Sequence, residues 1–491
     1  DRGEPERVGP FCSAFIHLVQ GDDARARKGI EQTLALLPSV EDARTFNMPM
    51  HWAACVYDWC YDLLTDADKQ RFIDEFIRIA SSHAPGYPAS MECHAVVGHE
   101  TEGWILTAQL PAGVAIYDES TEMYDAAAKV FFERFVPVRE YHYPSHTHHQ
   151  GDSYGTRLLY DLAASWLFRR MGAGDVLSRH QRFVPYHTIY NLRPDGQQIR
   201  RGDSYTPGRS GRKKAIMMMA GSYYEDPYLL TMADSDTFDD GLQPLHQVFE
   251  LLLRPAGAEK RPISDLPETK LFPTPMGEMV ARTGWNMGID SRDAVVFMRA
   301  GGTFFGNHQI RDMGTFQVYY RGALAIVTGL YQSDDTHYGT DHWKCYYHQT
   351  LATNGLLIFD PDEPVRRIRP VNDGGQRLPN EERDHPRNME QILEDGYELA
   401  TVAGRGFGPD PQSPEYSHIA GDITGAYTEK VEAVSRSMVT LNLQDDRYPS
   451  ALVVYDRVVA ADPSFRKTWL LHSIQEPRIE GSTTTVVRDE E

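Results

Sequence analysis

The segment Met50–Ala84, MHWAACVYDWCYDLLTDADKQRFIDEFIRIASSHA, decides the fold of the first half of this chain. Its apolar residues recur at helical spacing, at Ala54, Tyr57, Cys60 and Leu63. The tetrapeptide TDAD then interrupts the pattern, and a second periodic run carries Phe72, Phe76 and Ile79. Thr65 stands where it can cap that run, with Asp68 in the first turn. The segment therefore predicts two helices joined by a short turn, an αα-hairpin.

The second half of the chain changes character near Pro262–Pro275. Short β-rich runs follow, separated by Gly, Asp and Pro turns: DAVVFMRAGG, GTFQVYYRGALAIV, NGLLIFD, ALVVYDRVVA and KTWLLHSI. Helices followed by strands indicate an α+β fold, which we divide into a helical domain over 1–262 and an antiparallel β-sheet domain over 263–491. The chain ends on VVRDEE without a clear terminal element, so we expect the β region to be truncated at its C-terminus.

The charge and hydropathy of the sequence limit the classes of binding partner that we expect. The 491 residues carry a net charge of −21, from 49 basic and 70 acidic side chains, which argues against general nucleic-acid binding. No apolar run approaches the roughly 20 residues that a membrane helix needs, so we expect no membrane partner. The segment 193–214 is locally basic and is compatible with an acidic polymer as substrate. The chain opens on Asp1 rather than Met, which indicates a processed or trimmed protein.

Two clusters of chemically competent side chains lie in the helical half. CHAVVGHETEGW places His99 and Glu102 three residues apart, on one face of a helix, although an ordinary polar helix start accounts for them equally well. SHTHHQGDSYGTR carries histidines whose spacing matches no standard zinc motif, followed by Tyr154 and Arg157. Because a nearby guanidinium favours a phenolate, we expect Arg157 to lower the pKa of Tyr154.

Two more clusters follow. RPDGQQIRRGDSY is a turn-rich basic loop that contains Arg201. FFGNHQIRDMGTFQVYYRGALAIVTG, Phe304–Gly329, holds the lone histidine His308 in a run that otherwise resembles a buried strand. From its own sequence context, His308 can be a core residue, half of a metal site or a catalytic group.

In this order, these motifs resemble the heparinase II/III-like polysaccharide lyases, most closely the heparinase II branch. The resemblance runs from about Ala53 to Gln475 and rests on HETE, HHQGDSYG, RPDGQ…RRGDSY, NHQIRDMGTFQVYYRGALAI and KTWLLHSIQEP. It implies an incomplete N-terminal (α/α) toroid followed by antiparallel, β-sandwich-like sheet layers. It also implies degradation of uronic-acid glycosaminoglycans, with heparin or heparan sulfate, chondroitin sulfate or hyaluronan as the substrate.

The resemblance also assigns roles to residues. These enzymes cleave by β-elimination, which needs a base for the C5 proton of a uronate, an acid for the leaving oxygen and a partner for the carboxylate. Tyr154 and His308 correspond to the acid/base groups, and His99 and Glu102 to the pair beside the carboxylate. We expect four further residues to bind substrate: Arg157, Arg201, His149 and Gln150.

Relatives hold a zinc ion that looks structural, and this chain departs from them there. Ile310, Val327 and Thr353 occupy the three ligand positions, and none of these side chains is a good zinc ligand. We therefore expect no cofactor, with Ile310 and Val327 filling the site by apolar packing. A metal held elsewhere, by His337, His342 or the His146–His149 cluster, remains an open alternative.

Other functions stay open at this stage. A uronyl C5-epimerase would use the same proton abstraction, and an alginate lyase the same elimination. A hydrolase would need two flanking carboxylic acids, for which Tyr154 and His308 are a poor substitute. A non-catalytic polysaccharide-binding protein is the alternative from another class. The family leads us to expect a secreted or periplasmic, bacterial-type protein that forms a homodimer.

Overall fold

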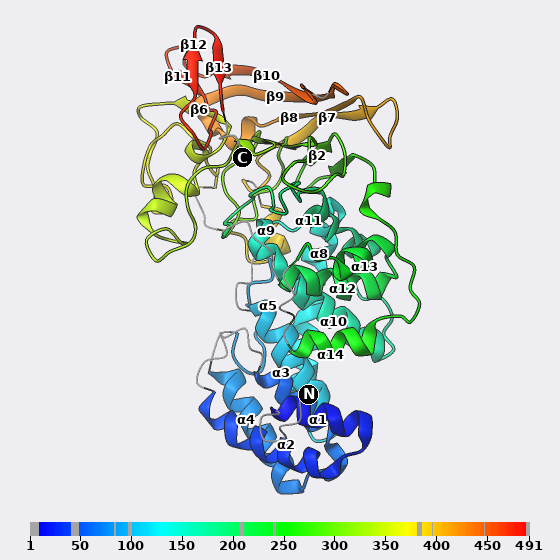
Figure 1. Ribbon diagram of the computed structural model, residues 1–491. Coiled ribbons are helices and arrows are strands. Elements are labelled where there is room, and N and C mark those ends of the chain that lie inside the picture. Colours follow the sequence, from blue (N-terminus) through cyan, green and yellow to red (C-terminus); the bar gives the residue numbers. More distant parts are fainter. Residues whose placement is uncertain are drawn as a thin grey trace.

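The computed structural model describes residues 9–487 except 41–48, 83–84, 97–100, 206–210, 239–241, 243, 381–384, 395 and 446. The molecule is elongated, with α1, α2 and α4 at one end and the sheets at the other (Figure 1). The helices are α1 Pro10–Gln20, α2 Asp23–Leu36, α3 Pro49–Trp59, α4 Asp66–Ser81, α5 Thr101–Trp104, α6 Leu110–Ala115, α7 Glu122–Val130, α8 Val136–His142, α9 Gly151–Tyr154, α10 Leu158–Arg170, α11 Tyr186–Tyr190, α12 Gly211–Tyr224, α13 Pro227–Asp234, α14 Pro244–Leu253 and α15 Met389–Ile392.

The predicted αα-hairpin is confirmed by α3 and α4. The Thr65 hydroxyl accepts a hydrogen bond from the Asp68 amide at 3.1 Å. The Asp68 carboxylate accepts one from the Thr65 amide at 3.2 Å, which completes a capping box. Phe72, Phe76 and Ile79 are fully buried on the inner face of α4, as their spacing predicts.

Two pairs of consecutive helices are joined by wide π-helical turns. Ile105–Gln109 joins α5 to α6, and Phe131–Phe135 joins α7 to α8. Each wide turn ends two residues before a proline, Pro111 or Pro137. Because proline cannot donate its backbone hydrogen bond and crowds the preceding turn, the wider turn lets each pair of helices continue past it.

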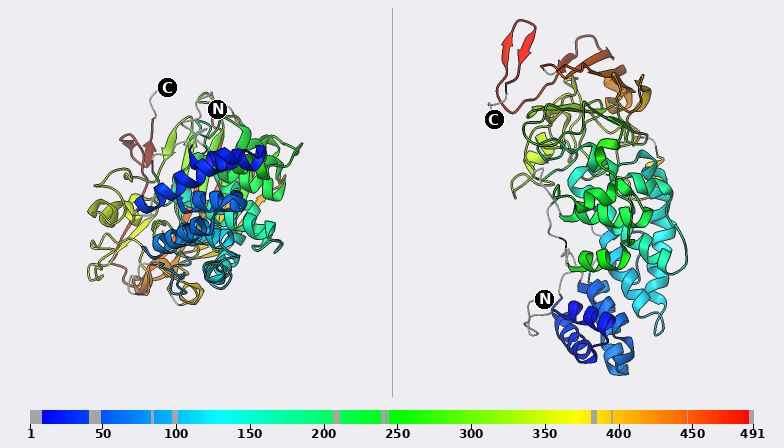
Figure 2. Two further views of the ribbon diagram at one scale, coloured as in Figure 1. Left: turned by 90° about the horizontal axis from the view of Figure 1, so that it is seen from below. Right: turned by 45° about the vertical axis from the view of Figure 1, so that its right-hand side comes forward.

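Within the described residues, four antiparallel sheets are formed by the strands that follow α14. The five-stranded sheet has the order β1-β2-β3-β4-β5 and the four-stranded sheet the order β10-β9-β8-β7, while β6 pairs with β11 and β12 with β13. The strands are β1 Thr269–Phe272, β2 Glu278–Arg282, β3 Ala294–Arg299, β4 Phe316–Tyr320, β5 Ala323–Ala325, β6 Leu356–Phe359, β7 Thr401–Gly408, β8 Tyr416–Asp422, β9 Val431–Asn442, β10 Ser450–Ala460, β11 Arg466–Trp469, β12 Arg478–Glu480 and β13 Thr483–Thr485. The β12–β13 hairpin projects from the sheet end of the molecule (Figure 2). The β-rich runs recognised in the sequence cover β3–β6, β10 and β11, but not β1, β2, β7–β9, β12 or β13.

Strand β3 shows why both faces of the five-stranded sheet are buried. Val295 and Phe297 belong to the large cluster that includes the helical core, whereas Val296 and Met298 belong to the cluster shared with Ile419 of β8. Successive side chains of a strand point to opposite faces, so one face packs on helices and the other on the four-stranded sheet. The result is three layers: helices, five-stranded sheet and four-stranded sheet.

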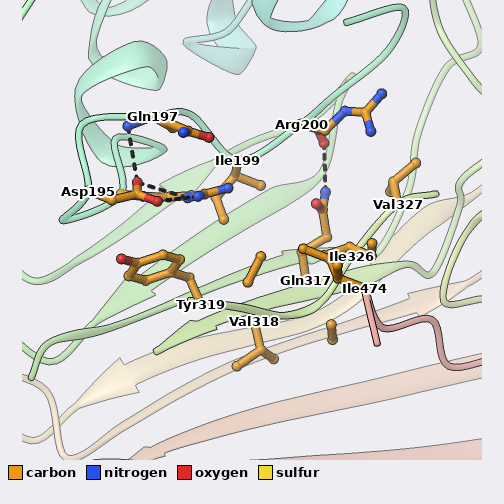
Figure 3. A pocket seen from close by; sticks show the side chains of 13 residues that line it. Asp195, Gln197, Ile199, Arg200, Gln317, Val318, Tyr319, Ile326, Val327 and Ile474 are labelled. Atoms are coloured by element: carbon orange, nitrogen blue, oxygen red, sulfur yellow. Dashed lines mark hydrogen bonds and ion pairs between the residues drawn. The ribbon is translucent and has the colours of Figure 1, made fainter. Parts of the chain in front are cut away.

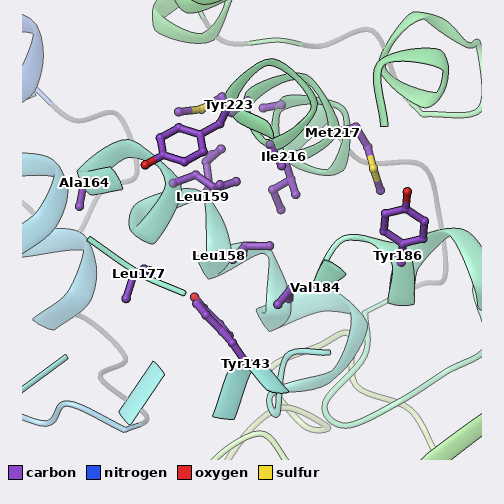
Figure 4. Packing of buried hydrophobic residues seen from close by; sticks show 14 of the residues in the cluster. Tyr143, Leu158, Leu159, Ala164, Leu177, Val184, Tyr186, Ile216, Met217 and Tyr223 are labelled. Carbon is purple, nitrogen blue, oxygen red and sulfur yellow. The ribbon is translucent and has the colours of Figure 1, made fainter. Parts of the chain in front are cut away.

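The helical core continues across the boundary that we predicted between 262 and 263. Leu159 of α10 lies near Ile216 of α12 within this packing (Figure 4). The same cluster includes Phe272 of β1 and Val280 of β2. The change from helix to strand therefore does not divide the hydrophobic core. The described helices include none long and apolar enough to cross a bilayer.

Candidate functional site

Three segments that lie far apart in the sequence meet around Tyr154. A Cβ atom added to Gly151 would lie 2.1 Å from the Arg201 carbonyl oxygen, and one added to Gly202 would lie 2.5 Å from the His308 carbonyl oxygen. Both glycines have positive φ angles, of 79° and 59°. The three segments therefore touch backbone to backbone at positions where only glycine fits.

Tyr154 lies among other aromatic side chains at the end of α9. Its hydroxyl oxygen is 3.1 Å from the Tyr205 hydroxyl and 3.1 Å from the Tyr331 hydroxyl. Its ring stacks face to face on the His308 imidazole, with centroids 3.4 Å apart and planes 5° apart. We call Tyr154, Tyr205, Tyr331, His308 and Asp203 the phenol cluster.

Asp203 holds His308 in place beneath Tyr154. The Asp203 carboxylate lies 2.9 Å from His308 Nδ1, and the Asp203 amide donates to the His308 carbonyl at 2.7 Å. The Trp343 indole N–H donates to the other carboxylate oxygen at 2.8 Å. Burial raises the pKa of Asp203 well above its ordinary value, against the hydrogen bonds from Trp343 and Tyr331. His308 is only 1% exposed, so its imidazole does not reach solvent directly.

The pKa of Tyr154 is raised, so our expectation of a lowered value was wrong. Burial is the main cause, and the hydrogen bond to Tyr205 adds to it, while the bond to Tyr331 opposes it. The Arg157 guanidinium carbon lies 5.0 Å from the ring centre, over the ring rather than beside the phenol oxygen. Arg157 is itself buried, and burial lowers its pKa. A protonated phenol is the state that this arrangement favours.

Of the predicted substrate-binding residues, Arg157 and Gln150 accompany Tyr154. Arg157 Nη1 donates to Gln150 Oε1 at 2.9 Å, and both side chains are buried. They form the inner wall behind the phenol rather than an exposed anion site.

Glu102 lies in a buried ionic group with Arg139 of α8 and Asp161 of α10, which we call the Arg139 triad. Arg139 binds Glu102 through Nη2 and Asp161 through Nε, the latter at 2.9 Å. Burial raises the pKa of Glu102, against the opposing charge of Arg139. The triad ties three helices together. The predicted partner His99 lies outside the described residues.

Arg201 and His149 are also directed inward. Arg201 Nη2 binds Glu278 Oε1 of β2 at 2.6 Å, and both side chains are buried. His149 stacks on His148 with ring centroids 4.8 Å apart and lies against Phe305 at 4.9 Å. Burial lowers the pKa of His149 well below its ordinary value, which keeps the ring neutral. In this structure neither residue lies where a polysaccharide would touch it.

The basic segment 193–214 differs from our expectation in the same way. Arg193 forms an ion pair with Asp195. Arg200 donates to the Gly329 carbonyl at 3.0 Å and to the Tyr347 hydroxyl at 3.2 Å. The charges of Arg193 and Arg200 are thus used within the fold: Arg193 pairs with a near neighbour, and the partners of Arg200 lie more than 100 residues away in the sequence.

At the zinc positions of the resemblance, Ile310 and Val327 belong to one apolar cluster with Tyr331, Trp343 and Tyr347. The third position, Thr353, is buried and donates its hydroxyl to the Thr350 carbonyl at 2.9 Å. Two aliphatic side chains and an engaged hydroxyl do not fit zinc.

The alternative metal sites are not supported by the described residues. Across them, no three His, Cys, Asp or Glu side chains are arranged to hold a metal ion. One of the alternative ligands, His342, accepts a hydrogen bond from the Leu330 amide at 3.3 Å.

A pocket of about 340 Å³ lies beside this region, between the segment 193–200 and strands β4 and β5 (Figure 3). Gln317 donates to the Arg200 carbonyl at 2.6 Å across one side of it. Val327 lines the pocket and also packs in the apolar cluster behind the phenol cluster. No phenol-cluster residue lines the pocket itself.

Sequence reasoning missed Asp203, Tyr205 and Tyr331. A signal for two of them was present, because the tetrapeptide Gly-Asp-Ser-Tyr occurs twice, at 151–154 and at 202–205. The two copies pack on each other: the Ser204 hydroxyl donates to Asp152 at 2.9 Å, and the Tyr205 amide donates to the Ser153 hydroxyl at 3.0 Å. Tyr331 carries no comparable sequence signal.

Comparison with known proteins gives a fold. No family model and no curated protein matches this sequence. A heparinase III structure aligns with 92% of this chain and 62% of its own, at 12% identity and a TM-score of 0.51. A heparinase III gene product aligns at 13% identity and a TM-score of 0.47, over 92% and 64% of the two chains. The chain thus spans less than two thirds of the length of either structure. The mixed fold of helices and antiparallel sheets is similar to that of heparinase III.

Proposed function

We propose that this protein is a polysaccharide lyase that cleaves uronic-acid polysaccharides by β-elimination. The observation that carries the proposal is the position of the Tyr154 hydroxyl, 3.1 Å from each of two other phenols and above the buried His308–Asp203 pair. A positioned proton donor of this kind is what expulsion of a glycosidic oxygen requires. The similarity of the fold to heparinase III supports the same class of reaction.

In the proposed reaction, a base removes the C5 proton of a uronate and the electron pair expels the oxygen on C4. Tyr154, whose pKa is raised, holds its proton at neutral pH and donates it to the leaving oxygen. His308 supports this step from beneath, because its buried imidazole fixes the plane of the Tyr154 ring. Its role is therefore narrower than the acid/base role that the sequence resemblance implies.

The uronate carboxylate also needs a neutralising partner, since the intermediate carries negative charge beside it. We assign this role to Arg157, whose guanidinium carbon lies 5.0 Å from the Tyr154 ring centre; it acts through its charge from behind the phenol rather than by direct contact with the sugar. Glu102 acts through Arg139, which it helps to hold, rather than by touching the sugar. For His99 the proposal rests on the HETE motif alone.

The finer assignments rest on the motifs as well. We propose a member of the heparinase II branch, with the helices of 1–262 as an incomplete (α/α) toroid and the zinc replaced by Ile310 and Val327. Secretion or a periplasmic location, and a homodimer, belong to the same proposal.

A substrate panel tests the function. Incubation with heparan sulfate, chondroitin sulfate, hyaluronan and alginate, followed by ultraviolet absorbance of the unsaturated uronate, should give rising absorbance with at least one polymer. Flat absorbance with deuterium incorporation at C5 would instead indicate an epimerase. New reducing ends without unsaturation would indicate a hydrolase, and binding without any reaction a non-catalytic protein. Each of these three results contradicts the lyase proposal.

A further inference from the structure

Tyr205 is the member of the phenol cluster that faces outward. Its side chain is 48% exposed, whereas Tyr331, on the other hydrogen bond of Tyr154, is 1% exposed. The Tyr154 and Tyr205 hydroxyl oxygens are 3.1 Å apart and their ring centroids 5.9 Å apart. A sugar that reaches the Tyr154 hydroxyl from solvent therefore meets Tyr205 at the same time.

The position of Tyr205 is fixed by its own backbone. Its amide donates to the Ser153 hydroxyl at 3.0 Å, next to Tyr154 in the chain. The preceding Ser204 hydroxyl donates to Asp152 at 2.9 Å, and the close approach at Gly202 holds the segment against His308. The two phenols are thus presented as a pair by the two packed Gly-Asp-Ser-Tyr segments.

We infer that Tyr205 is the second catalytic group, the base that removes the C5 proton while Tyr154 donates its proton to the leaving oxygen. This inference rests on the proposed function. The Tyr205 phenolate takes the proton, the C5–H electron pair forms the C4–C5 double bond, and the C4–O bond breaks with its electrons on the oxygen. That oxygen receives the Tyr154 proton. The proton on Tyr205 then passes to the Tyr154 phenolate across the 3.1 Å contact, which restores the starting pair.

His308 and Tyr331 are poorer candidates for this base. Each is 1% exposed, and His308 Nδ1 faces Asp203 at 2.9 Å. A base must come within hydrogen-bond reach of the proton that it removes. Of the titratable groups described in the phenol cluster, Tyr205 satisfies this requirement with the least rearrangement.

The pairing also selects the substrate. Because both hydroxyls lie on one side of the sugar, the C5 proton and the C4 oxygen must lie on the same face of the ring. Glucuronate and mannuronate have this syn arrangement, whereas iduronate and guluronate have the anti arrangement. The proposed substrates are therefore polymers of the syn class, such as hyaluronan or polymannuronate.

The test compares Tyr205→Phe with Tyr455→Phe, a control at a 68% exposed tyrosine on β10. On hyaluronan and polymannuronate, Tyr205→Phe should lower kcat by about 10²-fold or more with an unchanged melting temperature, and the control should match wild type. Wild-type kcat/KM should rise with pH if the base acts as a phenolate, and this rise should be absent in Tyr205→Phe. A C5-deuterated substrate should show a larger isotope effect in this variant.

Two results would overturn the inference and leave the proposed function standing: full activity in Tyr205→Phe, or wild-type cleavage confined to polyguluronate and iduronate-rich dermatan sulfate. A wild-type protein that produces no unsaturated uronate from heparan sulfate, chondroitin sulfate, hyaluronan or alginate overturns the proposed function, and this inference with it.

Discussion

The phenol cluster and the Arg139 triad each contain residues from motifs that led to one functional prediction, Tyr154 and His308 in the first and Glu102 in the second, yet the two groups are physically different. In the phenol cluster, three hydroxyl groups gather around Tyr154, and one of them, on Tyr205, is half exposed. In the triad, two carboxyl groups are buried, and both are held by the same guanidinium. Groups of the first kind can meet a substrate, and groups of the second kind build the support. Motif membership alone does not distinguish the two.

The largest effect should come from removing the Tyr154 hydroxyl. Tyr154→Phe keeps the ring that stacks on His308 but removes the proton donor, so kcat should fall by about 10²- to 10⁴-fold, a barrier increase of about 3–5 kcal/mol. Steady-state ultraviolet assays measure this, with Tyr455→Phe as the matched control. Full lyase activity in Tyr154→Phe would remove the phenol cluster from the mechanism.

Disruption of the Arg139 triad should lower the stability of the protein. Arg139→Met leaves Glu102 and Asp161 buried without their cation, which should lower the free energy of unfolding by about 3–5 kcal/mol. Urea denaturation followed by circular dichroism measures this change.

The control for that variant is Arg261→Met. Arg261 pairs with Glu259 at 2.7 Å, where the side chains are 52% and 66% exposed, so the variant should unfold at the same urea midpoint as wild type. Equal losses in the two variants would show that the buried triad contributes no more than a surface pair.

Acid should lower the stability of the fold through its buried histidines. Burial lowers the pKa of His142 to about 3 and those of His51 and His187 to about 4. Below the unfolded pKa of about 6.5, such a histidine binds a proton in the unfolded chain but stays neutral in the folded one. The stability that is fully present above this pH is therefore lost as the pH falls.

Each such histidine should therefore lower the free energy of unfolding by up to about 1.4 kcal/mol for each unit that the pH falls between about 6.5 and 4. Glu278, whose pKa is lowered to about 2, adds to the loss only below about pH 4.5, near the unfolded pKa of Glu. Urea midpoints at pH 7.5, 6.0 and 5.0 measure the slope, and His142→Gln should flatten it by one proton. A flat profile over this range would contradict the assignment of these rings as buried and neutral.

The smallest expected effect is on stability, at a helix cap outside the phenol cluster and the Arg139 triad. Thr65→Ala removes the capping box of α4 and should cost about 1 kcal/mol in thermal or urea unfolding. Thr121 is also the N-cap residue of its helix, α7, but its side chain makes no capping bond. Thr121→Ala is thus the matched control and should change stability by a few tenths of a kcal/mol at most. If both variants behave alike, the Thr65 bonds do not stabilise α4.

Local patterns predicted what depends on near neighbours. The helices around Thr65, the strands β3 and β4, and the glycine-led segment before Tyr154 follow from spacing within a few residues. What sequence reasoning missed depends on distant partners. Arg201 looked like an anion contact because nothing near it reveals Glu278, 77 positions away. The raised pKa of Tyr154 has the same origin, because it comes from burial and from Tyr205, 51 positions away.

The convergence of three segments on Tyr154 also sets when the site exists during synthesis. Asp203 must wait for His308, 105 residues later, and Trp343 joins Asp203 from 140 residues later. Because such long-range contacts form late and domains fold as their residues emerge, a ribosome-bound chain holds its helices well before it holds this cluster. The nascent protein is therefore a helical scaffold without an assembled site, and the phenol cluster forms only after most of the chain has been made.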